Sequence, residues 1–199
     1  MRIVVLVSGR GSNFQAIVDN VAAKNLSVTC TQMITDNPNA YAIHRAHNAG
    51  IPVTVIDYHA FPSRKEYEVD LLLALDELQP DLIVLAGYMR IIGKEIVLAY
   101  KERIINIHPS LLPSFPGLHA QAQALAHGVK VAGCTVHFVD EEMDAGPIIL
   151  QRCVRVCDDD TVEVLEERIL AEEHIALSHA IQLFCDGKLK ICDRRVFIL

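Results

Sequence analysis

Residues 3–13 read Ile-Val-Val-Leu-Val-Ser-Gly-Arg-Gly-Ser-Asn, and the order of these residue types predicts the architecture. Five consecutive apolar residues are typical of a strand that is buried on both faces of a parallel sheet. The glycine-bearing turn at 8–12 ends that strand, and Asn13 is expected to cap a helix that runs to about Lys24. A buried strand followed at once by a helix is the opening unit of a βαβ fold.

The same alternation continues along the chain. Further strands are expected at 28–35, 52–57, 82–86 and 104–107, and helices at 41–49, 63–78 and 93–100. Ser63 is expected to cap the helix at 63–78. This rhythm predicts an α/β fold with a doubly wound, mostly parallel sheet and a Rossmann-like N-terminal part.

The rhythm changes in the C-terminal third. A proline-rich loop at 109–117 and a helix at 120–127 precede strands at 131–139 and 147–156. The turn between those strands is too short for a crossover helix, so they are expected to be antiparallel. Thr161 then caps a long helix to about Phe184, and a polar tail ends in 196–199. We expect one domain, 1–199.

Composition and charge exclude several classes of protein. The chain has 51% hydrophobic residues and a net charge of −7 without a basic cluster, so we expect no nucleic-acid partner. The uncharged stretch 104–129 carries three Pro and three His, so we expect no membrane span. The six scattered Cys and an apolar run at 3–7 too short for a signal peptide predict a cytoplasmic protein with reduced thiols.

The turn at 8–13 is the first candidate site. Its glycines let backbone N–H groups approach an anion, and the helix that follows offers its positive end, so the turn favours a phosphate. Phe14 stands where a dinucleotide fingerprint needs a third small residue, and no Gly-Lys-Ser/Thr follows. A plain tight turn is the alternative.

The end of the strand at 104–107 is the second candidate site. Alternation places Asn106 and His108 on one face, beyond the carboxyl end of a strand, where α/β proteins bind ligands. An amide donor beside an imidazole suits an oxyanion and a proton transfer. A buried histidine with a purely structural hydrogen bond is the alternative.

The acidic stretch 140–147 is the third candidate site. Four carboxylates there are either a solvated turn or the source of one carboxylate that stabilises an imidazolium ring, for which Asp144 is the candidate. The nine His show no metal-ligand spacing such as HExxH, so we expect no metal.

With these segments assembled, the sequence resembles the folate-dependent formyltransferases that act on glycinamide ribonucleotide in purine synthesis. The resemblance extends along nearly the whole chain, and its strongest segments are 8–13, 85–91, 106–113, 133–139 and 144–147.

The resemblance implies transfer of the formyl group of 10-formyltetrahydrofolate, a co-substrate, to the amine of 5′-phosphoribosylglycinamide through a tetrahedral intermediate. Residues 1–108 would form the nucleotide- and phosphate-binding part, and 109–199 the folate-binding and C-terminal part. The partners implied are these two small molecules, and the protein itself is expected to be a monomer or a homodimer.

The resemblance also implies a role for particular residues. Asn106, His108 and Asp144 would be catalytic. The phosphoribosylglycinamide site would comprise Gly11, Ser12, Asn13 and Glu173. The folate site would comprise Arg64, Met89, Arg90, Ile91, Ile92, Asn106, Asp140 and Asp144.

The sequence differs from the family pattern at two places, and several alternative functions remain to be compared. The family often has a Tyr-Pro pair where this chain has Leu177-Ser178, and a polar contact to the nucleotide is common at the position of Leu170, so the resemblance does not extend to the fine contacts of this helix with the ribose. Methionyl-tRNA formyltransferases add a basic RNA-binding domain, which the length and charge do not match. Formyltetrahydrofolate hydrolase, whose catalytic pattern follows an extra N-terminal domain, is the closest enzymatic alternative. A non-catalytic nucleotide or folate sensor and a dehydrogenase are weaker alternatives.

Overall fold

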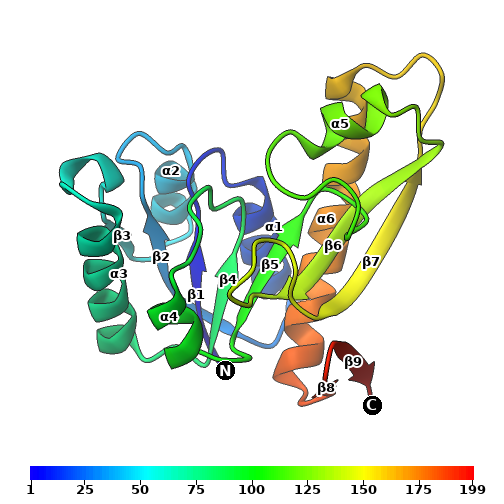
Figure 1. Cartoon of the computed structure of the whole chain (residues 1–199). Coiled ribbons are helices and arrows are strands. Elements are labelled where there is room, and N and C mark those ends of the chain that lie inside the picture. The colour runs from blue at the N-terminus through cyan, green and yellow to red at the C-terminus, as the bar shows by residue number, and fades with distance from the viewer. The chain divides into compact units, whose positions relative to one another are not determined.

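The computed structural model describes residues 1–199 and divides the chain into two compact units, Met1–Ile105 and Asn106–Leu199 (Figure 1). The first unit alternates strands and helices as the sequence predicts. Its elements are β1 (Arg2–Leu6), α1 (Ser12–Ala22), β2 (Thr29–Thr35), α2 (Ala42–Asn48), β3 (Val53–Val55), a short 3₁₀ turn (Tyr58–Ala60), α3 (Arg64–Leu78), β4 (Leu82–Leu85) and α4 (Lys94–Ala99).

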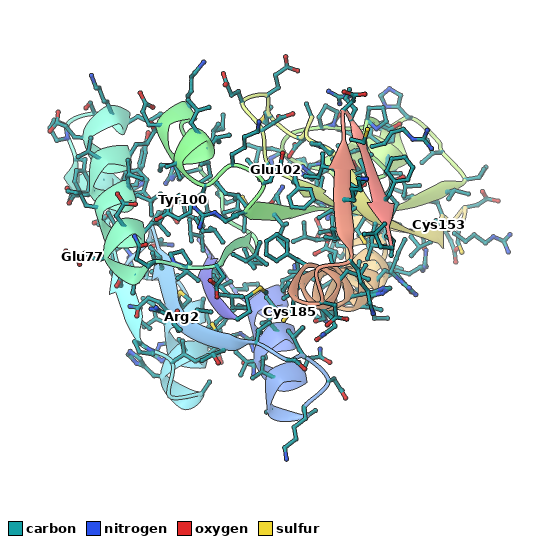
Figure 2. All side chains as sticks on the ribbon, turned by 90° about the horizontal axis from the view of Figure 1, so that it is seen from below. Arg2, Glu77, Tyr100, Glu102, Cys153 and Cys185 are labelled. Atoms are coloured by element: carbon teal, nitrogen blue, oxygen red, sulfur yellow. The ribbon has the colours of Figure 1, made fainter.

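The strands of the first unit lie in the order β3-β2-β1-β4 and are all parallel. Residues 3–7 and 82–86 are buried, as expected for strands with both faces covered. Arg2, labelled in Figure 2, secures the start of β1: its N–H donates to Asp81 Oδ2 (2.6 Å) and its guanidinium to the Leu78 carbonyl (2.7 Å). Ser63 caps α3 by accepting from the Glu66 N–H (3.3 Å), which confirms that prediction.

One expected cap is wrong. Helix α1 begins at Ser12 behind Gly11, with no side-chain cap, and Asn13 lies in the first helical turn. Gly11 has φ = +70°, and a Cβ there would lie 2.7 Å from the Ala42 Cβ. A residue without a side chain is therefore needed where the chain enters the helix, which moves the boundary ahead of Asn13.

The second unit follows β5 (Ile104–His108), whose last three residues belong to it. Its other elements are α5 (Ala120–Ala126), β6 (Val131–Phe138), β7 (Ile148–Arg155), α6 (Val162–Cys185), β8 (Leu189–Cys192) and β9 (Arg195–Ile198). Strands β6 and β7 are antiparallel, as predicted. The polar tail is not a simple extension, because β8 and β9 form a hairpin and β9 pairs parallel with β7.

Helix α6 packs against β6 and β7, and Thr161 caps it by accepting from the Val164 N–H (3.4 Å). The buried stripe of α6 is apolar except for Glu173, which is 7% exposed. The predicted fold class, α/β with mostly parallel strands, an antiparallel addition and a long C-terminal helix, is confirmed.

Candidate active site

The glycine turn after β1 is held in place by its neighbours in the first unit. Arg45 donates from Nε to the Arg10 carbonyl (2.8 Å) and from Nη1 to Gln15 Oε1 (3.2 Å). Gly11, Ser12 and Asn13 therefore form a fixed turn at the start of α1, and the positive end of that helix favours an anion there.

The segment after β4 lines a cavity of about 180 Å³ in the first unit. The lining residues are Tyr58, Arg64, Tyr67, Glu68, Met89, Arg90 and Ile91. Four of the residues predicted to contact folate thus lie together, whereas Ile92 is buried and is not part of the lining.

Two side chains fix the backbone of this segment. The Met89 N–H donates to Ser8 Oγ (2.8 Å), and Arg90 pairs through Nε with the buried carboxylate of Asp36 (2.6 Å). The guanidinium of Arg90 also lies 4.0 Å from the centre of the Tyr58 ring, a favourable cation–π contact. Met89 and Ile91, the residues on either side of Arg90, are exposed and present apolar surface to the solvent.

In the second unit, His108 and Asp144, two of the residues predicted to be catalytic, are in contact. The third, Asn106, is linked to them through His137, whose Nε2 lies 3.8 Å from Asp144 Oδ1. Asn106 and His108 come from β5, and Asp144 comes from the turn between β6 and β7. His108 Nδ1 lies 3.4 Å from Asp144 Oδ2. The same carboxylate oxygen accepts from the Gly117 N–H (2.8 Å), which orients it toward the histidine.

The second ring nitrogen of His108 also faces an acceptor. Its Nε2 lies 2.9 Å from the Phe115 carbonyl, which can only accept, so Nε2 carries hydrogen. A carboxylate at Nδ1 and a carbonyl at Nε2 provide acceptors for both N–H groups of an imidazolium ring. His108 is 5% exposed, so these contacts are formed away from bulk water.

His137 is a member of this cluster that the sequence reasoning did not identify. It is 2% exposed, its Nδ1 lies 2.8 Å from the Phe138 carbonyl, and its Nε2 lies 3.2 Å from Asn106 Nδ2. Burial lowers the pKa of His137, outweighing the Phe138 carbonyl and the charge of Asp144, which raise it. An imidazole within the apolar run 131–139 was the available signal, because a buried polar ring needs partners.

Asp140 and Glu173 are the two other acidic residues that were predicted to bind substrates. Asp140 Oδ1 accepts from the Glu142 N–H (3.0 Å), so it closes its own turn. Glu173 is buried on α6, and Leu170 and Leu177 lie on the same helix, half-buried and buried respectively.

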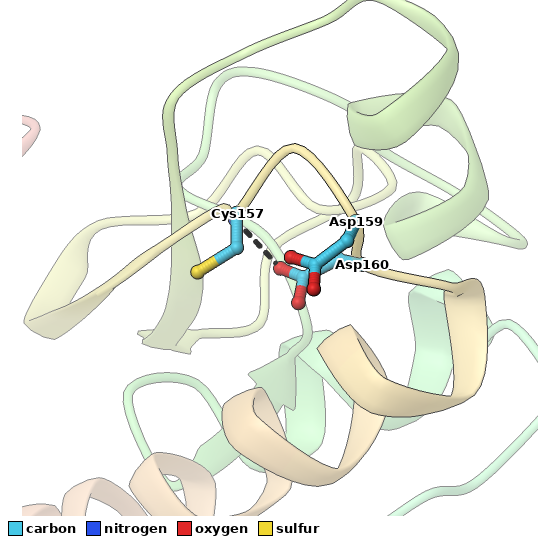
Figure 3. Close-up of side chains that lie close together, drawn as sticks. All are labelled: Cys157, Asp159 and Asp160. Carbon is cyan, nitrogen blue, oxygen red and sulfur yellow. Dashed lines mark hydrogen bonds between the residues drawn. The ribbon is translucent and has the colours of Figure 1, made fainter.

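One group of side chains has atoms close enough to consider for a metal ion. Potential ligand atoms of Cys157, Asp159 and Asp160 lie within 4.8 Å of one another just before α6 (Figure 3). However, Asp160 accepts two bonds from Arg168 (2.6 and 2.8 Å) and one from the Cys157 N–H (2.8 Å). These bonds hold its pKa at about 2 and identify a salt-bridged turn.

The family model for formyl transferases matches residues 1–181. The chain therefore belongs to the formyl transferase family, which confirms the resemblance seen in the sequence.

Individual relatives narrow the comparison. The chain is 40% identical over 198 residues to phosphoribosylglycinamide formyltransferase of Escherichia coli strain K12, covering 100% of this chain and 93% of that protein. The crystal structure of glycinamide ribonucleotide transformylase 1 from Symbiobacterium toebii matches with a TM-score of 0.98 and 51% identity, covering 100% of this chain and 94% of that one.

A formyltetrahydrofolate deformylase from Pseudomonas syringae is also similar. Its TM-score is 0.92 at 27% identity, covering 100% of this chain and 65% of that one. The fold is thus shared by proteins named for formyl transfer and for deformylation.

Among the helices of the chain, none combines the length and the apolar composition that a membrane span needs.

Proposed function

We propose that this chain transfers the formyl group of 10-formyltetrahydrofolate to the amine of phosphoribosylglycinamide. The observation that carries the proposal is the cluster of Asn106, His108 and Asp144, with the carboxylate 3.4 Å from the imidazole. Similarity to phosphoribosylglycinamide formyltransferases over the whole chain supports it.

In the proposed reaction, the glycinamide amine attacks the formyl carbon and forms a new C–N bond. The formyl oxygen becomes an oxyanion, to which His108 and Asn106 donate hydrogen bonds. Collapse of this intermediate breaks the bond from carbon to the folate nitrogen, and the proton lost by the amine balances the one gained by that nitrogen. Asp144, with Oδ2 3.4 Å from Nδ1, holds the His108 ring oriented.

The contact of His108 with Phe115 adds one requirement. The Nε2 hydrogen is donated to the Phe115 carbonyl (2.9 Å), so the oxyanion would replace this carbonyl as its acceptor. Use of Nε2–H for the oxyanion therefore requires the Phe115 carbonyl to move away from the ring.

The binding roles belong to the same proposal. Gly11, Ser12 and Asn13 would hold the phosphate, and Glu173 another part of the ribonucleotide. Arg64, Met89, Arg90, Ile91, Ile92, Asp140 and Asp144 would contact the folate. No metal is needed for this chemistry, and we infer a cytoplasmic protein that works on small molecules as a monomer or homodimer.

The test follows the absorbance of the deformylated folate, with and without phosphoribosylglycinamide. We expect turnover only with the ribonucleotide. His108→Ala and Asp144→Ala should each lower kcat about 10²–10³-fold, the usual loss when an oxyanion donor is removed. Asp159→Asn, an exposed carboxylate outside the cluster, serves as the control. Turnover without ribonucleotide would instead support deformylation, the activity named for the Pseudomonas relative.

A further inference from the structure

His137 occupies an irregular position on β6. The pairing of β6 with β7 shifts between Val136 and His137, so that Val136 faces Leu150 and His137 faces Ile148. Such a bulge redirects a side chain, and bulges are common next to active sites. Here the redirected ring is buried between the Phe138 carbonyl and the amide of Asn106.

The backbone acceptor decides which ring nitrogen of His137 carries the hydrogen. A carbonyl only accepts, so at 2.8 Å from the Phe138 oxygen Nδ1 must be the donor. The charges that face the ring are Asp144 and Asp140, which favour the imidazolium, and His108, which opposes it. Burial outweighs them and favours the neutral ring. A neutral ring with Nδ1–H leaves a lone pair on Nε2.

That lone pair decides the orientation of the Asn106 amide. The amide nitrogen Nδ2 lies 3.2 Å from His137 Nε2 and donates one of its two hydrogens to it. If Nε2 carried the hydrogen instead, the amide would rotate to present Oδ1, because two donors cannot pair. The second N–H of Nδ2 is the group that an oxyanion needs.

The turn before β7 supports the Phe138 carbonyl. A Cβ at Gly146 would lie 1.8 Å from the Phe138 oxygen, so the backbone at Gly146 packs directly against it. The Phe138 N–H in turn donates to the Pro147 carbonyl (2.9 Å). The stretch that carries Asp144 thus also fixes the peptide that sets the tautomer of His137.

We propose that His137 is a positioning residue for formyl transfer: as the neutral Nδ1–H tautomer, it holds the Asn106 amide so that the second Nδ2–H is available to the oxyanion. This inference rests on the proposed function. It concerns a residue that does not touch the reacting atoms and acts through Asn106.

Two amide substitutions separate the two contacts of the ring. In His137→Gln the side-chain oxygen reaches the position of Nε2 and accepts from Asn106. In His137→Asn the amide ends near the position of Nδ1, so the Phe138 contact is kept and the Asn106 contact is lost. We expect kcat to fall about 10²-fold in His137→Asn, as for loss of an oriented oxyanion donor, and much less in His137→Gln. KM for both substrates should change little in either variant.

Two further measurements separate positioning from a general structural role. In an Asn106→Ala background, His137→Asn should add almost no further loss of kcat, because the group that it positions is gone. Nitrogen-15 NMR of the His137 ring should show a protonated Nδ1 and an unprotonated Nε2. Urea unfolding of each variant shows whether lost activity follows lost stability.

The wild-type enzyme separates failure of the inference from failure of the proposed function. If it shows no ribonucleotide-dependent turnover, the proposed function fails and the inference fails with it. If that turnover is present, three results overturn the inference alone: equal losses in His137→Gln and His137→Asn, an undiminished loss in the Asn106→Ala background, or a hydrogen on Nε2.

Discussion

The hydroxyl of Thr135 connects β6 to the loop that follows His108. Thr135 is fully buried, and its Oγ1 donates to the Ser110 carbonyl (2.6 Å). The same oxygen accepts from the Leu112 N–H (3.0 Å) and from Gln151 Nε2 (3.0 Å). One side-chain atom therefore satisfies two backbone groups of the loop, and its removal should have a large and specific cost.

Thr135→Val removes the hydroxyl and leaves the shape almost unchanged. The Leu112 N–H and the Ser110 carbonyl then stay buried without this partner. An unsatisfied buried polar group costs about 1–3 kcal/mol, so the two should lower the free energy of unfolding by about 2–6 kcal/mol. Thr135→Ser keeps the hydroxyl and loses one methyl group, which costs only about 1 kcal/mol.

Urea unfolding of the wild type and the two variants tests this ranking. We expect the midpoint of Thr135→Val to lie well below that of Thr135→Ser, with unchanged m-values. Equal midpoints for the two variants would refute the reasoning, because packing alone would then account for Thr135. A changed m-value would show that the substitution altered the compactness of one state.

Three other predictions follow from single contacts. Burial raises the pKa of Cys30 to about 12, so at pH 8 a thiol reagent should label exposed Cys153 long before Cys30, and equal labelling rates would contradict this. Because Arg168 lowers the pKa of Asp160 to about 2, this pair stabilises the fold above the unfolded-state pKa of about 4 and loses its effect as pH falls toward 2. Urea midpoints of Asp160→Asn should accordingly vary less with pH in that range than those of the wild type. Gly133→Ala places a Cβ 2.0 Å from a backbone oxygen of β7, and calorimetry should show a lower Tm, equivalent to about 1–3 kcal/mol.

Most helices and strands could be predicted from the sequence because the interactions that begin and end them are between residues close together in the chain. Ser63 and Thr161 cap their helices as expected, since a cap depends on residues three positions away. Asn13 was wrong as a cap because the approach of α2 to Gly11, a contact between residues 31 apart in sequence, moves the start of α1. The hairpin of β8 and β9 was missed because each strand has only four residues, too few for a period-2 pattern to stand out from the rest of the tail.

For the candidate site, too, the sequence predicted some features and only the structure showed the others. Alternation along β5 predicted that Asn106 and His108 share a face, and chemistry suggested a carboxylate from the acidic turn. The 3.4 Å approach of Asp144, the Phe115 carbonyl at His108 and the part played by His137 are tertiary facts. The roles of these residues in catalysis remain predictions for the kinetic tests described above.

The sequence by itself determined the class of fold, the positions of the glycine turn and the reactive side chains, and the family of the chain. These depend on residue type, order and short-range spacing. Tertiary structure alone decided which ring nitrogens of His108 and His137 carry hydrogen and which way the Asn106 amide points. The reason is physical: the tautomer depends on where acceptors lie around the ring, and strand irregularities and neighbouring turns decide their positions. For His137, the bulge in β6 and the packing of Gly146 on the Phe138 carbonyl supply that arrangement.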